Sequence, residues 1–310
     1  HLNVNMSQKI PIRTLRRFTT PLKPVLLGGE ESYGLPEHIS LEVEYDRFGK
    51  IIREVKFDQH GEAEEIHSYR YDERGHLLEH LMELPQDGIM EKFVTELNPD
   101  GNPLSIIKFY GDDPGERTEY RYGTHAHPVF IHRTDADGEF DSSDEFMYDD
   151  SPRLIKRSFK STYEEKEFQF SYNENGWLVE EIELDSSGDL VSTLQYDYRD
   201  DGQEAVIVKK NASGKTESTQ VNEFDELGRV VRRVSKGFYI RISGYVYDEL
   251  GRLTEETLSD ENGFVISRKH TVFGEDGRIL QETAYETDLT RTGRDSHLAH
   301  RFEYEDFSAD

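Results

Sequence analysis

The sequence contains no cysteine, which excludes a disulfide framework, a thiolate nucleophile and any zinc or iron–sulfur site built on cysteine. It also lacks an apolar run of about 18 residues, the length that a membrane-spanning helix needs. The apolar stretch at 24–27 is shorter than the roughly 7–15 apolar residues of a signal peptide. We therefore expect no membrane span and no signal peptide. Two compartments stay open, since the protein is either cytoplasmic or exported with its signal peptide trimmed.

Basic residues are scarce relative to acidic ones. The chain has 37 Lys and Arg against 64 Asp and Glu, which gives a net charge of -27. This charge excludes nucleic acid as a partner, because nucleic acid needs a basic footprint, and it favours a protein partner of basic character. Residues 1–29 depart from this pattern, since they contain basic residues and no acid. These basic residues are Lys9, Arg13, Arg16, Arg17 and Lys23. We predict a separate basic, proline-containing N-terminal arm over 1–40.

Hydrophobic residues make up only 34% of the chain, against 33% charged residues. Such a mixture is typical of disordered proteins when aromatic residues are also few. Here Phe, Tyr and Trp together reach 11%, and these side chains bury large areas when they pack. A sheet with one packed face and one solvated face fits this composition.

An aromatic residue followed by a turn rich in Asp, Asn and Gly recurs about every 26 residues, in about ten copies of varying strength. We call these segments the anchor turns. The aromatic anchors are Tyr45, Tyr71, Tyr122, Tyr148, Tyr172, Tyr198, Phe224, Tyr247 and Phe273. The anchor glycines are Gly49, Gly75, Gly101, Gly176, Gly228, Gly251 and Gly277. A second set of turns, the mid-unit turns, lies between them, so that a turn comes about every 12 to 14 residues.

Between the turns, apolar and polar residues alternate, as in EFQFSYN (167–173) and SGYVYDE (243–249). This period of two, with many aromatic and β-branched residues, predicts strands with one packed face. The predicted fold class is therefore all-β, with tandem antiparallel β-hairpin repeats over 41–284. We expect the hairpins to form one long twisted, curled sheet, with a five-bladed β-propeller as the alternative. Residues 285–310 break the spacing and are predicted to form a C-terminal cap.

The anchor aromatic residues have two interpretations. They could stack on a ligand, but side chains at the same position of successive hairpins more simply form a packing stripe, with their hydroxyl groups at the rim. The Asp that follows most anchors is interpreted as a hydrogen-bond acceptor within the turn. We therefore assign the anchor residues to the structure of the repeat.

The anchor motif resembles the YD repeat of bacterial Rhs proteins and related toxin-complex shells. The resemblance is carried by YDRFGKI (45–51), YDERGHL (71–77), FDELGRV (224–230) and YDELGRL (247–253). It extends from residue 41 to about residue 283, at the level of repeat type. It implies hairpins joined edge to edge in a long curled sheet, which in large members of the family closes into a shell around a toxin. In the sequence given we identify neither a self-cleaving core segment nor a toxin domain.

Only weak candidates for a chemical site are found, and no catalytic residue or cofactor is predicted. Asp135, Asp137 and Asp141 lie in an acidic turn that resembles a calcium loop, which makes them candidate metal ligands. The Gly of this turn comes too early for an EF-hand, and no flanking helices are expected. Carboxylates are abundant, but the sequence singles out no pair of the glycosidase type.

Three functions follow from these observations. The first is a non-catalytic bacterial protein-binding or scaffold protein that uses an acidic repeat sheet, with a toxin-associated or immunity-like role by analogy with the resembling family. The second is a carbohydrate or cell-wall binding module that presents aromatic side chains on an open face. The third is a glycosidase-type hydrolase with a carboxylate pair. We favour the first, without predicting the identity of the partner or the oligomeric state.

Overall fold

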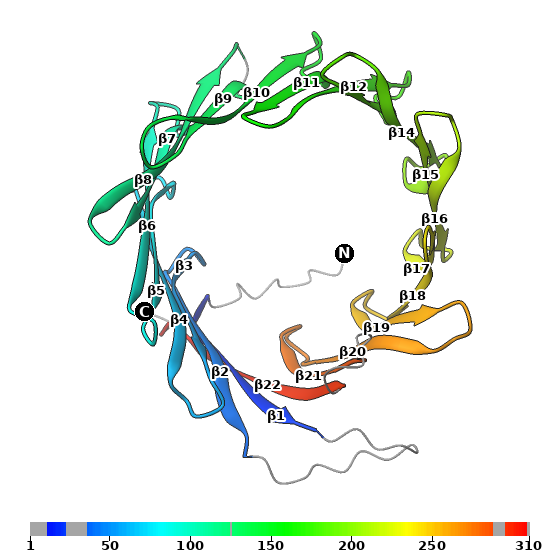
Figure 1. The fold of residues 1–310 in the computed structure, drawn as a ribbon. Helices are drawn as coiled ribbons and strands as arrows, with labels where there is room; N and C mark the ends of the chain where they lie inside the picture. The colour runs from blue at the N-terminus through cyan, green and yellow to red at the C-terminus, as the bar shows by residue number, and fades with distance from the viewer. Residues whose placement is uncertain (1–10, 23–35, 125, 288–294, 309–310) are drawn as a thin grey trace, which may run out of the picture.

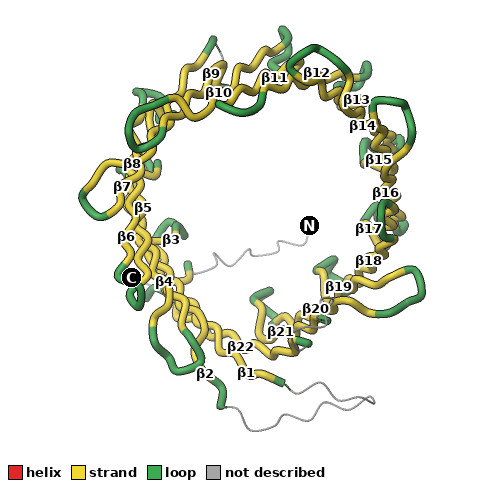
Figure 2. Tube along the Cα trace, in the orientation of Figure 1, coloured by secondary structure: helices red, strands yellow, loops and turns green. Residues whose placement is uncertain are grey.

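The computed structural model describes residues 11–22, 36–124, 126–287 and 295–308. This part of the chain consists of strands and turns and contains no helix (Figure 2). Consequently, it contains no helix that is long and apolar enough to cross a membrane. The strands are β1 (Ile12–Pro21), β2 (His38–Tyr45), β3 (Ile51–Phe57), β4 (Ala63–Tyr71), β5 (Leu77–Leu84), β6 (Ile89–Leu97), β7 (Pro103–Tyr110), β8 (Asp113–Tyr122), β9 (Pro128–Thr134), β10 (Phe140–Tyr148), β11 (Leu154–Ser161), β12 (Glu165–Tyr172), β13 (Leu178–Asp185), β14 (Leu190–Tyr198), β15 (Glu204–Asn211), β16 (Thr216–Phe224), β17 (Val230–Lys236), β18 (Ile240–Tyr247), β19 (Leu253–Asp260), β20 (Val265–Phe273), β21 (Ile279–Glu286) and β22 (Ser296–Asp306).

The strands form one 22-stranded antiparallel sheet that closes on itself (Figure 1). From β2 to β22, each strand pairs with its neighbours in sequence. The first strand closes the ring, because β1 pairs with β2 along one edge and with β22 along the other. Arg16, for example, lies opposite Glu42 of β2 and opposite Glu303 of β22. The fold is therefore a closed barrel.

This closure corrects two predictions, although the all-β class is confirmed. The open curled sheet is wrong because the two ends of the array pair through β1, which removes the free edges that an open sheet would expose. The five-bladed propeller is also wrong. A propeller consists of separate four-stranded blades, whereas the ladder of hydrogen bonds here runs without a break around the ring.

Anchor turns and mid-unit turns lie at opposite ends of the barrel. The anchor turns join β2 to β3, β4 to β5 and every second pair after these, whereas the mid-unit turns join β3 to β4, β5 to β6 and so on. Successive turns of an antiparallel meander fall at opposite ends of the sheet. The barrel therefore has an anchor-turn rim and a mid-unit-turn rim.

The wall of the barrel is a single layer with charged side chains on both faces. Arg53 and Glu44 form an ion pair of 3.2 Å on one face, and Lys56 and Glu65 form one of 3.0 Å on the other. The buried apolar side chains are only Val43, Val55 and Ile266 within the described residues. Most other strand side chains are half-buried, so packing is spread along the wall and no central core forms.

The two ends of the chain meet at the closing seam. β1 lies within the predicted basic arm, and β22 lies within the predicted C-terminal cap. Arg278 and Asp306 form an ion pair of 2.6 Å beside this seam, and Arg301 of β22 pairs with Glu37 at 2.7 Å. Residues 1–10 and 23–35 of the arm and 288–294 and 309–310 of the cap lie outside the described residues.

Candidate functional site

One anchor turn shows how the repeat motif folds locally. Asp248 Oδ1 accepts hydrogen bonds from the backbone N–H groups of Leu250 (3.0 Å) and Arg252 (2.9 Å). Gly251 has a φ of 81°, in the left-handed region that side-chain-bearing residues disfavour. Arg252 Nε donates to Asp248 Oδ2 at 2.6 Å, and its guanidinium lies 4.7 Å from the ring centre of Phe273, the next anchor. The Asp thus shapes the turn and also directs the Arg over the following hairpin.

The anchor hydroxyl groups bond across two strands that a mid-unit turn joins, and they thereby link each anchor-turn hairpin to the anchor-turn hairpin before it. Tyr247 Oη donates a hydrogen bond to the Val230 carbonyl oxygen at 2.9 Å. Tyrosines that donate to a return strand in the same way are Tyr71, Tyr122, Tyr148, Tyr172, Tyr198 and Tyr304. Tyr45, Phe224 and Phe273 hold the equivalent register position beside a β-bulge. The anchor glycines, Gly49, Gly75, Gly101, Gly176, Gly228, Gly251 and Gly277, have φ values of 77° to 88°. All of the predicted anchor aromatics are half-buried.

The mid-unit-turn rim combines acidic charge with exposed apolar side chains. Tyr163 is 97% exposed and Phe238 is 93% exposed. Further exposed apolar side chains at this rim are Ile89, Met90, Tyr110, Phe140, Leu190, Val191, Tyr239 and Phe264. The described mid-unit turns comprise 58–62, 85–88, 111–116, 135–139, 161–165, 185–189, 211–215, 236–239 and 260–264. Within these turns, the Lys and Arg residues are limited to Lys215 and Lys236. The anchor-turn rim also exposes apolar side chains, such as Phe48 and Leu227, but its turns carry basic residues such as Arg229. The mid-unit-turn rim is therefore the more acidic of the two and the better suited to a basic partner.

The turn between β11 and β12 holds Tyr163 away from the wall. Ser161 Oγ accepts hydrogen bonds from the backbone N–H groups of Tyr163 (3.3 Å) and Glu164 (3.0 Å). The Ser161 N–H in turn donates to the Glu164 carbonyl oxygen at 2.7 Å. These bonds make a tight turn, and the ring at its tip is left in solvent.

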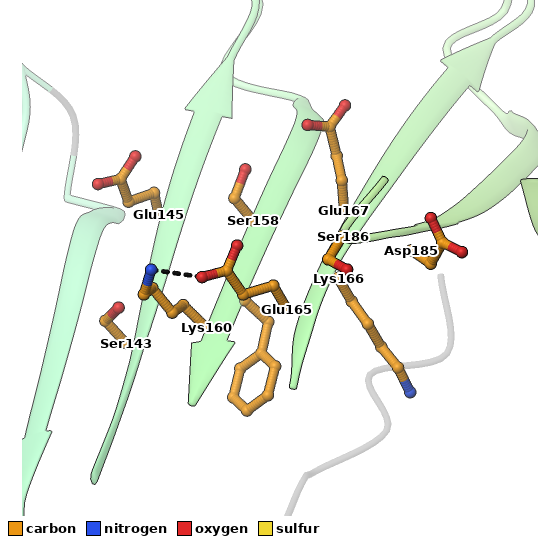
Figure 3. A pocket seen from close by; sticks show the side chains of 10 residues that line it. Ser143, Glu145, Ser158, Lys160, Glu165, Lys166, Glu167, Asp185 and Ser186 are labelled. Atoms are coloured by element: carbon orange, nitrogen blue, oxygen red, sulfur yellow. Dashed lines mark ion pairs between the residues drawn. The ribbon is translucent and has the colours of Figure 1, made fainter. Parts of the chain in front are cut away.

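A charged groove lies below this turn (Figure 3). It has a volume of about 320 Å³, and side chains of β10 to β13 line it. Lys160 and Glu165 form an ion pair across it, as Figure 3 shows. Glu167 pairs with Lys156 at 2.5 Å, and hydrogen bonds from Lys156 and Gln169 lower the pKa of Glu167. The groove is thus lined by ionised groups.

The predicted metal candidates serve the turn in which they lie. Asp135 Oδ1 accepts hydrogen bonds from the backbone N–H groups of Asp137 (3.0 Å) and Glu139 (2.9 Å). Asp141 Oδ2 accepts one from Ser142 Oγ at 2.9 Å. Across the residues that the structure describes, no three His, Asp or Glu side chains are grouped so that they could hold a metal ion. The structure does not bring the three acids together.

The sequence analysis missed a row of ionisable side chains on the wall. His67 Nδ1 lies 2.7 Å from His80 Nε2, and His67 Nε2 forms a hydrogen bond with Glu65. The ring of Tyr69 stacks on that of His80 with centroids 4.7 Å apart. The spacing of two between Glu65, His67 and Tyr69 was the available signal, because it places them on one face. Protein groups occupy both ring nitrogens of His67, so this residue has no free position for a ligand.

A second missed feature is a buried carboxylate. Asp144 is 2% exposed and lies between two arginines of the neighbouring strands. It accepts hydrogen bonds from Arg133 Nη1 at 2.8 Å and from Arg157 Nε at 2.7 Å. Charged residues at the middle of a strand predict a solvated face, so the sequence alone gave no signal for this burial. Both of its oxygens are satisfied, and the feature is structural.

Comparison with known proteins finds matches among solved structures. No protein-family model matches the chain, and no curated protein matches it in sequence. The solved structures that match include two complexes, TcdB2-TccC3 and TcdB2-TccC3-Cdc42. Each is 11% identical and covers 95% of this chain, with a TM-score of 0.34. This chain covers 24% and 23%, respectively, of those chains, less than a quarter of their length.

A porin-like protein from Bacteroides uniformis ATCC 8492 also matches. It is 10% identical, with 96% of this chain and 97% of that chain covered and a TM-score of 0.33. Similarity at this level gives no information on partner or activity. The closed barrel by itself contradicts the prediction of no membrane span. That prediction considered only helices, whereas closed barrels satisfy every backbone group within a bilayer by pairing between strands.

Proposed function

We propose that this chain is a non-catalytic barrel scaffold that binds a protein partner through its mid-unit-turn rim. The observation that carries the proposal is the presence, on one rim, of exposed aromatic side chains among almost uniformly acidic turns. Aromatic side chains are enriched in protein interfaces, and complementary charge steers partners together. The net charge of the chain is -27, so the complementary partner is basic.

A toxin-associated or immunity-like role is the specific form that the YD-repeat resemblance favours. A basic toxin domain or a basic segment of a toxin complex would have the charge that the rim requires. This part of the proposal depends on the repeat motif, as in YDELGRL at 247–253.

The two alternatives have less support. A glycosidase needs a general acid with a raised pKa, whereas hydrogen bonds from Lys156 and Gln169 lower the pKa of Glu167 in the groove. A carbohydrate module would need a row of open aromatic rings. The regularly spaced anchor rings, such as that of Phe273, are half-buried and lie beside a cation, whereas the exposed rings of Tyr163 and Phe238 lie in separate turns of the rim.

Affinity capture tests the proposed function. The full chain is immobilised and exposed to proteins of its source cells at low and at high ionic strength, and the retained proteins are identified and purified for direct titration. We expect a basic protein that binds at low ionic strength and is released at high ionic strength, because screening weakens charge pairing. Retention of no protein under either condition, or turnover of a panel of chromogenic glycosides, would refute the proposal.

A further inference from the structure

The mid-unit-turn rim is not uniform in charge around the ring. The six mid-unit turns from the one joining β3 to β4 through the one joining β13 to β14 contain acids and no Lys or Arg, and so does the turn joining β19 to β20. By contrast, the turns joining β15 to β16 and β17 to β18 contain Lys215 and Lys236. Three of the acidic turns, those joining β9 to β10, β11 to β12 and β13 to β14, are neighbours in the sheet (Figure 1), and their strands β10 to β13 line the charged groove. We call the surface of these three turns the acidic arc.

The acidic arc also carries an unbroken series of exposed apolar side chains. Phe140, Tyr163, Leu190 and Val191 come from its three hairpins in order. Neighbouring strands are about 4.8 Å apart, so the six strands from β9 to β14 span roughly 25–30 Å. A standard interface buries about 800 Å² on each partner, which corresponds to a patch about 30 Å across. The arc therefore has the width of one protein interface.

The groove of Figure 3 is lined by β10 to β13, which are among the strands of the acidic arc. Its lining runs from Glu145 of β10 to Asp185, the last residue of β13, and Glu165 lies at the start of β12, next to the acidic turns. The lysines of the groove are already paired, since Lys160 pairs with Glu165 and Lys166 pairs with Glu164 at 2.7 Å. Glu145, in contrast, has no Lys or Arg partner among the described residues. The groove thus keeps a carboxylate that can accept a cation from outside.

We propose that the acidic arc is the docking surface for an extended basic segment of the protein partner, an inference that rests on the proposed function. An apolar residue of the segment packs on Tyr163, and a lysine or arginine side chain enters the groove toward Glu145. Charge complementarity selects this occupant, because a second copy of the chain would place acids against acids. At about 3.3 Å per residue, a segment of roughly eight or nine residues crosses the arc.

Two matched pairs of variants test this docking surface. Tyr163→Ala is compared with Phe238→Ala, since both rings are almost fully exposed at the same rim but only Tyr163 lies in the acidic arc. Glu145→Lys is compared with Glu249→Lys, which makes the same change of net charge at the anchor-turn rim. The probe is a fluorescein-labelled decapeptide of alternating lysine and valine, and its binding to the full chain is measured by anisotropy. The glutamate–valine counterpart is the control peptide.

We expect the lysine peptide to bind and the glutamate peptide not to bind. Tyr163→Ala and Glu145→Lys should each weaken binding at least about fivefold, as expected for residues at an interface centre. Phe238→Ala and Glu249→Lys should change it less than about twofold. Failure of the lysine peptide to bind, or equal losses within each pair, would overturn the docking surface. If Tyr163→Ala retains a captured partner protein as well as the unchanged chain does, the docking surface is wrong but the proposed function still stands. If the unchanged chain captures no protein, the proposed function is wrong.

Discussion

Removing the hydroxyl of an anchor tyrosine tests whether the repeat is stabilised by bonds between hairpins. In Tyr247→Phe, the ring keeps its place beneath Arg229, whose guanidinium lies 4.7 Å from the ring centre. Only the hydrogen bond to the Val230 carbonyl, 2.9 Å long, is lost. Such a bond contributes about 0.5–1.5 kcal/mol, and near a rim, where water can replace the donor, we expect about 0.5–1 kcal/mol.

A second variant makes this small effect measurable. Tyr172 donates the same bond to the Leu154 carbonyl at 2.8 Å, several hairpins away, so the double variant Tyr172→Phe/Tyr247→Phe should lose about 1–2 kcal/mol. The matched control is Phe273→Tyr, which restores the hydroxyl at an anchor that naturally lacks it and should raise the free energy of unfolding. Urea denaturation followed by circular dichroism gives these differences. An unchanged double variant, or a Phe273→Tyr variant that is less stable than the unchanged chain, would refute the reasoning.

Three further predictions concern acid, the seam and the buried carboxylate. Hydrogen bonds from Arg229 and Arg252 lower the pKa values of Asp225 and Asp248. Their stabilising contribution is therefore present above the unfolded pKa of about 3.9 and is lost as pH falls through the folded pKa. The melting temperature should therefore fall as the pH is lowered below about 4, and it should fall less steeply in the double variant Asp225→Asn/Asp248→Asn. An equal dependence of melting temperature on pH in the two proteins would contradict this. Deleting residues 1–22 leaves β2 and β22 without their partner strand, so size-exclusion chromatography should show self-association, and a monodisperse monomer would count against it. Asp144→Ala leaves two arginines that can still reach water, and calorimetry should show a loss of about 1–3 kcal/mol, whereas a loss below the measurement error would exclude the buried pairings as a source of stability.

The hairpins could be predicted because their signals are local. The turn around Gly251 needs a residue that accepts positive φ, and Asp248 supplies the acceptor for its backbone N–H groups. Both requirements are met within a few residues of sequence, so the motif marks most of the anchor turns. Most mid-unit turns are visible for the same reason, but the turn at 161–165 contains no Gly and uses Ser161 as its acceptor, so the motif did not mark it.

Closure of the barrel could not be predicted, because it depends on a pairing between the two ends of the chain. β1 lacks the anchor motif, and its basic residues with Pro11 and Pro21 favour an arm over a strand. The contacts that make it a strand, such as Thr19 with His300, come from the other end of the sequence. Local patterns also cannot separate a curled sheet from a ring, since every internal strand pair is the same in both.

The candidate site was only partly foreseeable. The acidic charge of the mid-unit turns is plain in the sequence, and so is the occurrence of an aromatic residue in some of them. Whether such a ring packs or is exposed depends on the tertiary structure. Tyr69 stacks on His80 across strands, whereas Tyr163 is left at the tip of a tight turn.

The seam also sets an order of events during synthesis of the chain. Each hairpin joins residues that are close in sequence and can form soon after it leaves the ribosome. The ladder between β1 and β22 joins residues from opposite ends of the chain, such as Ile12 and Asp306. We therefore expect closure to be the last and slowest step, after most of the wall has formed. Until that step, the nascent chain exposes a free strand edge at each end, and this interval is when it is most exposed to aggregation or to capture by a chaperone.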